Sequence, residues 1–171
     1  MYRAVLFDLD GTLCDVEAAR RLAEAEESTA GVRRSEHIAQ HVVPNPDAIA
    51  VLSALQRSVP VGVVSNGAAR AQRMKLRRCL PGLTLDGVFI SGVLGCRKPD
   101  PDIFLQALCH FGQAAESVLF VGDDPVTDIA GAAGVGMATA WMAHGRPTDS
   151  LPHPADYVIE SLHDVLEIVC P

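Results

Sequence analysis

The chain has 171 residues, of which 49% are hydrophobic and 20% charged, and this composition suits one globular domain with a sizeable core. Its formal net charge of −7 argues against general binding to nucleic acid, because a polyanion requires a basic face. No apolar run approaches the ~20 residues that span a bilayer, so we expect no contact with a membrane. The five cysteines form no CxxC pair, which favours reduced thiols in a cytoplasmic protein.

Short runs of β-branched and other apolar residues predict the strands of the chain. Each run is separated from the next by a stretch with helical periodicity or by turn residues. The predicted strands are Tyr2–Leu9, Pro60–Ser65, Gly87–Ser91, Val118–Val121, Gly136–Trp141 and, with a weaker pattern, Asp156–Ile159.

Three of the intervening helices have a clear start signal, in which a capping side chain precedes a proline at the first helical position. The three signals are Asn45-Pro46-Asp47, Asp100-Pro101-Asp102 and Asp124-Pro125. Gly112 is placed to end the second of these helices. Alternation of strands and helices predicts an α/β fold, with a doubly wound and mostly parallel sheet covered by helices on both faces. We expect one core domain over residues 1–171.

Polar side chains follow four of the predicted strands at the point where each strand ends. They are Asp8 and Asp10, then Ser65 and Asn66, then Lys98 after a loop, and then Asp123 and Asp124. In parallel sheets, ligands bind beyond the carboxyl ends of the strands. Four separate stretches of the chain are therefore predicted to meet on one rim of the sheet.

Taken in order, FDLDGT (7–12), VVSNG (63–67), Lys98 in CRKPDP (96–101) and VGDDPVTD (121–128) resemble the haloacid dehalogenase-like superfamily. The likeness is closest to its phosphoglycolate-phosphatase-type branch. Each motif alone is compatible with an ordinary turn, cap or surface position. Ordinary turn, cap or surface positions do not explain why all four motifs occur in this order. The resemblance implies a Mg²⁺-dependent phosphomonoester hydrolase that acts through an aspartyl phosphate. Its substrate would be a phosphorylated small molecule or a larger phosphoester.

The resemblance also implies roles for individual residues. Asp8 would attack phosphorus, and Asp10 would protonate the leaving oxygen and then deprotonate the hydrolytic water. Gly11 permits the tight turn between strand and loop, which the hydroxyl of Thr12 could fix by a hydrogen bond. Ser65 and the backbone N–H of Asn66 would hold phosphate oxygens. Lys98 would neutralise the charge on both Asp8 and the phosphate.

Carboxylates gathered without a cation repel one another, and oxygen ligands favour Mg²⁺. By resemblance, the direct ligands are Asp8, the backbone carbonyl of Asp10, and Asp123. Asp124 would act through water or orient the ligands, with an equally weighted alternative as the N-cap of its helix. Asp128 would likewise act through water or orient the ligands, and it is expected to support the ligands instead of being one of them.

The segment 14–44 is shorter than the helical cap that members of this branch usually insert after the first strand. Val16–Thr29 and Ser35–Val42 are predicted as helices that form a reduced lid. Arg33, Arg34, His37 and His41 could meet an anionic substrate, although solvated surface is the favoured interpretation. Such a lid leaves the site open, so that either a bulky substrate closes it or another subunit covers it. The first alternative is favoured, and it predicts broad acceptance of phosphomonoesters and a monomer or loose dimer.

Two other classes of function remain open. A phospho-accepting signalling module that resembles a response-regulator receiver also combines acids, Mg²⁺, a hydroxyl and a lysine, but its acceptor follows the third strand and not the first. A catalytically silent binding protein on the same type of fold is the other alternative. Mg²⁺-dependent turnover of an aryl phosphate would separate an enzyme from both.

Overall fold

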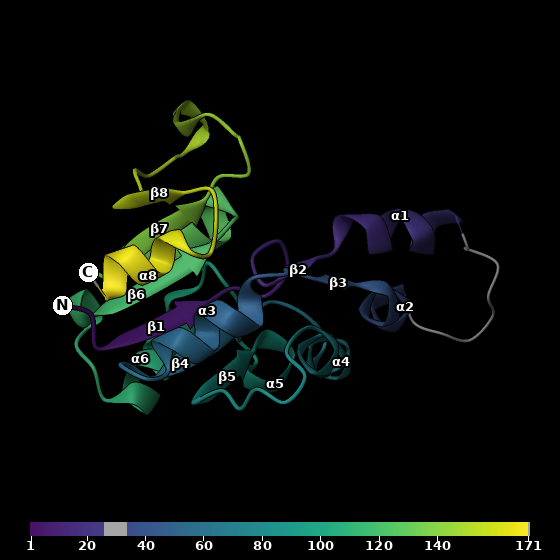
Figure 1. Ribbon diagram of the computed structural model, residues 1–171, viewed down its shortest axis with the longest axis horizontal. Helices are drawn as coiled ribbons and strands as arrows, with labels where there is room; N and C mark the ends of the chain where they lie inside the picture. The colour runs from purple at the N-terminus through teal and green to yellow at the C-terminus, as the bar shows by residue number, and fades with distance from the viewer. Residues whose placement is uncertain (26–33, 171) are drawn as a thin grey trace.

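The computed structural model describes residues 1–25 and 34–170, and it is built around a six-stranded sheet (Figure 1). The strand order is β5-β4-β1-β6-β7-β8, and every neighbouring pair is parallel. This arrangement confirms the predicted fold class. The strands are β1 Ala4–Phe7, β4 Val61–Ser65, β5 Gly87–Ile90, β6 Val118–Gly122, β7 Ala138–Met142 and β8 Tyr157–Ile159.

Helices cover both faces of this sheet. Alternate residues of its central strand point to opposite sides, so both faces carry apolar side chains that must be buried. In β1, Val5 and Phe7 pack into one core cluster, and Ala4 and Leu6 pack into another. The first cluster lies under α3 Ala48–Leu55, α4 Ala69–Cys79 and α8 Asp164–Val169. The second lies under α6 Pro101–Phe111 and α7 Gly131–Ala133. Shorter helices join the strands: α5 Ser91–Leu94, η1 Ala115–Ser117, the π-helical turn η2 Pro125–Ala130, and η3 Thr148–Ser150.

The first strand is shorter than its apolar run predicts. It ends at Phe7, and the amide of Asp8 still bonds the carbonyl of Val121 at 2.8 Å. Leu9 turns back instead of continuing, because its carbonyl accepts hydrogen bonds from the amides of Leu13 and Cys14 at 3.0 and 2.9 Å. This turn directs the side chains that follow β1 toward the rim of the sheet.

The helix start at Asp100 is confirmed, and the start at Asn45 is displaced. Asp100 accepts a hydrogen bond from the amide of Asp102 at 3.0 Å, and Gly112 ends α6 in the left-handed conformation at φ 61°. Asn45 does accept from the amide of Asp47 through its Oδ1 at 3.0 Å, but it caps a turn that precedes α3, in which its carbonyl accepts from the amide of Ala48 at 3.1 Å. Pro46 therefore lies in that turn and not at the first position of α3.

The insert leaves and re-enters the core through a two-stranded antiparallel ribbon, β2 Cys14–Asp15 and β3 Val43–Pro44. The sequence did not predict this ribbon, since two-residue strands are too short for a recognisable pattern. Two helices lie beyond the ribbon, α1 Glu17–Ala25 and α2 Arg34–His41 (Figure 1). Helix α2 packs against α4, and α1 packs against α2. The predicted helix Val16–Thr29 is confirmed only as far as α1 extends, and the rest of that range, with Arg33, lies outside the described residues.

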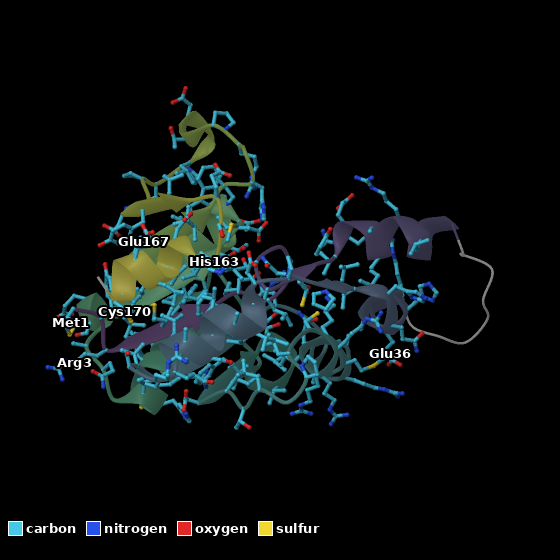
Figure 2. The ribbon with its side chains drawn as sticks, in the orientation of Figure 1. Met1, Arg3, Glu36, His163, Glu167 and Cys170 are labelled. Atoms are coloured by element: carbon cyan, nitrogen blue, oxygen red, sulfur yellow. The ribbon has the colours of Figure 1, made fainter. Side chains whose placement is uncertain are left out.

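Helix α4 anchors the insert to the core. The side chain of Arg78 donates to the carbonyl of Val42 at 2.8 Å. Arg70 forms an ion pair of 3.4 Å with Glu36, which is labelled on α2 in Figure 2. The insert therefore rests on the helix that immediately follows β4. Within the described residues, no helix has both the length and the apolar character required to cross a membrane.

Candidate active site

Four loops meet at the carboxyl edge of the sheet, as the sequence predicted. They follow β1, β4, β5 and β6, and they bring together residues that are up to 120 positions apart, from Asp8 to Asp128. Asp8, Ser65, Lys98 and Asp128 are all buried at this edge, and Asp123 is half-buried. The predicted residues thus form one cluster on the rim.

Lys98 lies between two carboxylates. Its Nζ is 2.5 Å from Oδ1 of Asp8 and 2.7 Å from Oδ1 of Asp128, and the side chain also lies over the ring of Phe120. The residue is only 2% exposed. Burial alone would lower the pKa of Lys98, but the two carboxylates raise it above its ordinary value. Lys98 is therefore a fixed positive charge beside Asp8.

The same surroundings also shift the pKa of Asp8. Burial raises the pKa of its carboxyl well above the usual range, and although Lys98 opposes this shift, Asp128 and Asp10 add to it. One lysine thus faces more negative charge than it can balance. A further cation at this place would stabilise the ionised form of Asp8.

Three carboxylates form a set that could hold such a cation. Oxygen atoms of Asp8, Asp123 and Asp128 lie within 4.8 Å of one another. Burial, followed by the charge of Asp128, raises the pKa of Asp123 to about 6. A ligand set made only of oxygen suits a hard cation such as Mg²⁺. The residues present therefore fit the predicted metal. The set includes Asp128, for which the sequence analysis expected only a supporting role.

Asp124 acts as the cap of the helical turn η2. Its Oδ1 accepts hydrogen bonds from the amides of Val126 and Thr127 at 2.9 and 2.7 Å. Burial would raise the pKa of Asp124, but these amide hydrogen bonds lower it below its ordinary value. The geometry thus favours the capping alternative for Asp124. Asp128 supports the same turn, because its Oδ2 accepts from the amide of Asp124 at 3.0 Å.

Two residues of α4 that the sequence analysis did not identify contact Asp10. Nζ of Lys75 lies 2.5 Å from Oδ2 of Asp10, and Nε2 of Gln72 lies 3.3 Å from the same oxygen. Gln72 also donates to Oγ of Ser65 at 2.7 Å and to the carbonyl of Asn66 at 2.9 Å. These two side chains are three positions apart and therefore share one face of the helix.

Asn66 holds the backbone of Lys98. Its side-chain amide donates to the carbonyl of Lys98 at 2.9 Å and accepts from the amide of Lys98 at 2.9 Å. The hydroxyl of Thr12, by contrast, is buried and has no hydrogen-bond partner among the described residues. The predicted hydrogen bond from Thr12 is therefore wrong. The turn is closed instead by the amide of Gly11, which donates to the carbonyl of Cys14 at 2.8 Å, with Gly11 at φ 97°.

The loop after β7 also reaches the rim, which nothing in its sequence signalled. Arg146 in this loop and Nε1 of Trp141 near the end of β7 donate to the carbonyl of Asp123 at 2.7 and 3.0 Å. Nε2 of His144 lies 2.7 Å from the carbonyl oxygen of Gly11, and His144 adopts the left-handed conformation at φ 50°. This loop thus braces both the first and the last acidic motif.

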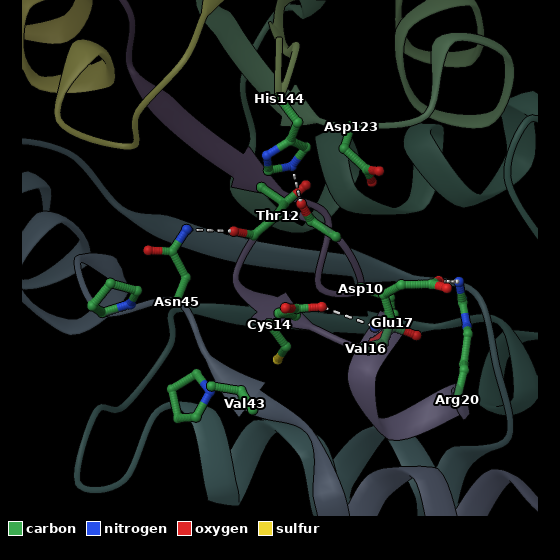
Figure 3. A pocket seen from close by; sticks show the side chains of 14 residues that line it. Asp10, Thr12, Cys14, Val16, Glu17, Arg20, Val43, Asn45, Asp123 and His144 are labelled. Carbon is green, nitrogen blue, oxygen red and sulfur yellow. Dashed lines mark hydrogen bonds and ion pairs between the residues drawn. The ribbon is translucent and has the colours of Figure 1, made fainter. Parts of the chain in front are cut away.

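A cleft of about 480 Å³ opens between the rim and the insert (Figure 3). Asp10, Asp123 and His144 line its inner side. Its outer side is lined by residues of the ribbon and of α1, namely Asp15, Val43, Glu17 and Arg20, and by Asn45 directly after β3. Arg34, His37 and His41 lie on α2 and are not among the described residues that line this cleft. A ligand in the cleft would touch both the acidic cluster and the insert.

Comparison with known proteins supports the resemblance in the motifs. A family model described as haloacid dehalogenase-like hydrolase matches residues 21–136. The chain is 33% identical over 135 residues to the pyrimidine 5'-nucleotidase YjjG of Escherichia coli, covering 78% of this chain and 60% of YjjG. It is 38% identical over 122 residues to a phosphoserine phosphatase of Thermus thermophilus, covering 70% of this chain and 49% of that one. The chain therefore spans about half to three fifths of the length of these relatives.

Solved structures share the fold. The magnesium-bound structure of YfnB from Bacillus subtilis superposes with a TM-score of 0.84 over 99% of both chains, at 21% identity. At this identity the likeness concerns the arrangement of the sheet and its helices.

Proposed function

The chain belongs to the haloacid dehalogenase-like hydrolases, and from this premise we propose that it is a Mg²⁺-dependent phosphomonoester hydrolase that works through a phosphorylated Asp8. One observation carries the proposal: two aspartates that are two residues apart each form an ion pair with a different lysine. Asp8 lies on Lys98, and Asp10 lies on Lys75. A nucleophile and a separate proton-transfer group are what hydrolysis through a covalent intermediate requires.

Asp8 would attack phosphorus through its carboxylate. Lys98 fixes one oxygen of that carboxylate by the 2.5 Å contact, so the other oxygen is left to form the bond. The same ammonium group would offset the negative charge that attack brings together at Asp8 and the phosphoryl oxygens. The 2.7 Å contact with Asp128 keeps Lys98 in place when the charge on Asp8 is lost.

Asp10 lines the cleft in which a leaving group would lie. It would donate its proton to that oxygen as the P–O bond breaks. In the second half of the reaction it would take a proton from water, which attacks the phosphoryl group on Asp8 and restores the free carboxylate. One residue thus serves two proton transfers.

Ser65 would hold a phosphoryl oxygen. Its Oγ already accepts from Gln72, so its own O–H remains available as a donor. The backbone N–H of Asn66 would supply a second donor, while its side chain keeps Lys98 aligned. Mg²⁺ would be held by Asp8, the backbone carbonyl of Asp10 and Asp123, with Asp128 in a supporting role, while Asp124 caps η2. When bound, it would supply positive charge to the phosphoryl oxygens.

The named relatives favour phosphoesters as substrates, because they include a nucleotidase and a phosphoserine phosphatase. The cleft supports a role for residues 14–44 as a reduced lid, since the ribbon and α1 form its outer wall. A leaving group would occupy this cleft. Its limited wall favours acceptance of several phosphorylated small molecules or of larger phosphoesters.

Release of phosphate from a panel of phosphomonoesters tests the proposal. We expect turnover with Mg²⁺, none after removal of the metal with a chelator, and recovery when Mg²⁺ is restored. The Asp8→Asn variant, nearly identical in shape, is the control for contaminating phosphatases. Metal-independent turnover, or activity retained in Asp8→Asn, would refute the proposed function.

A further inference from the structure

Lys75 is a buried lysine to which the proposed reaction steps assign no role of its own. It lies on the inner face of α4 with only 7% of its surface exposed. Lysine is rarely buried unless it is paired, because an isolated ammonium group is costly to remove from water. Its partner is Oδ2 of Asp10, at 2.5 Å. The fold therefore places a second lysine beside the acid–base aspartate.

Gln72, one turn earlier on the same face, contacts the same oxygen. Its Nε2 lies 3.3 Å from Oδ2 of Asp10, and its contacts with Ser65 and Asn66 fix it against the loop after β4. Oδ1 of Asp10 is buried as well, yet within the described part of the chain it has no hydrogen-bond partner. The two oxygens of this carboxylate are thus treated differently: one is held and the other is left without a partner.

We propose that Gln72 and Lys75 position Asp10: by holding Oδ2, they fix the orientation in which this carboxyl group transfers a proton to the leaving oxygen of the substrate. This inference rests on the proposed function. Asp10 lines the cleft, whereas Gln72 and Lys75 are not among the described residues that do. The two α4 residues therefore act through Asp10 and are positioning residues.

Proton transfer depends steeply on geometry, and a displacement of about 1 Å can cost roughly 10²-fold in rate. If Lys75 only balanced charge in the core, its loss would affect all substrates alike. If it positions Asp10, its loss matters most where the leaving group needs a proton. Phenol is a poorer leaving group than 4-nitrophenol, so phenyl phosphate should depend more on Asp10.

The test compares Lys75→Met with Arg73→Met, which removes the same charge from an exposed position on the same helix. We expect kcat/KM of Lys75→Met to fall roughly 10- to 100-fold with phenyl phosphate. With 4-nitrophenyl phosphate the loss should be several-fold smaller. Arg73→Met should match the parent with both esters. Equal losses of Lys75→Met with the two esters, or no loss with either, would overturn the inference.

A double-mutant cycle supplies a second measurement. In an Asp10→Asn background, Lys75→Met should lower kcat/KM no further, because the group that it positions is already gone. An additional loss as large as in the parent would show that Lys75 acts elsewhere. Lys75→Arg should recover part of the phenyl phosphate activity, and it carries the test if Lys75→Met does not fold. A parent without turnover of either ester would refute the proposed function, whereas an active parent that equals Lys75→Met refutes only the positioning role.

Discussion

The rim of the sheet and the insert both rely on ion pairs, but in opposite surroundings. At the rim, Lys98 and Asp8 have side chains that are 2% and 8% exposed. In the insert, Arg21 and Glu17 form a pair of 3.3 Å with side chains that are 76% and 59% exposed. Both pairs join a cationic side chain to a carboxylate, but the pair at the rim is buried and the pair in the insert is exposed to water.

This difference teaches what each region can contribute. Breaking a buried pair leaves a charge without compensation, which is strongly destabilising. An exposed pair is screened by water and salt and contributes about 0–1 kcal/mol. The rim can therefore hold strong, oriented charges for chemistry. The insert can offer shape and a wall for the cleft, but little electrostatic force.

Loss of Lys98 should have the largest effect on this contrast. In Lys98→Met, Asp8 and Asp128 lose their shared cation, so we expect a stability loss of about 3–5 kcal/mol at neutral pH. Turnover should fall by roughly 10²–10³-fold. Denaturant unfolding and phosphate release measure the two effects, with the exposed neighbour Arg97→Met as the matched control. Turnover of Lys98→Met within a few-fold of the parent would argue against a catalytic role for Lys98.

The pH dependence of metal binding sharpens the contrast next. Because the pKa of Asp123 is raised to about 6 in the folded protein, the folded state binds its proton more tightly than the unfolded state. The metal-free protein should therefore lose stability as pH rises through about 6. Mg²⁺ binds the ionised carboxylate, so its affinity should rise over the same interval, by at most about tenfold per pH unit for each proton displaced.

Calorimetric titration with Mg²⁺ between about pH 5 and pH 7 measures this effect. Asp123→Asn should bind Mg²⁺ more weakly and should show a flatter pH dependence. An affinity that is constant across this range in the parent protein would argue against Asp123 as a ligand.

The smallest effect is expected in the insert. Arg21→Gln removes one exposed partner of Glu17, and we expect the free energy of unfolding to change by less than about 0.5 kcal/mol. Turnover should stay unchanged, because Arg21 is not among the described residues that line the cleft. Denaturant unfolding in parallel with Lys98→Met gives the comparison directly. A loss above about 1 kcal/mol would erase the distinction between the two regions.

The sequence predicted the rim because its signals are local. Each strand is a short apolar run, and the polar residues that matter follow the strands directly, as Asp8 follows β1 and Asp123 follows β6. A parallel sheet then brings these strand ends to one edge without further information. The position of Lys98 was predictable in the same way, although its contact with Asp128 was not.

Residues that reach the site from a helix or a later loop could not be found by such signals. Gln72 and Lys75 belong to a helix with many polar residues, where a buried lysine and a solvated one look alike in sequence. Only the packing of α4 brings Lys75 to a carboxylate 65 positions away. The contacts of the loop with His144 and Arg146 could not be predicted for the same reason, because they depend on the placement of β7 beside β6.

The central claim is that the buried aspartate at the end of β1 becomes phosphorylated, and direct detection of the phosphoenzyme tests it best. The protein would be mixed with a phosphomonoester and Mg²⁺, quenched in acid within the first turnover, and digested for mass spectrometry. We predict a phosphoryl group on the peptide that contains Asp8, formed no later than the first product and absent from Asp8→Asn. Product formed without any phosphoenzyme, or a phosphoryl group on another residue, would contradict the account.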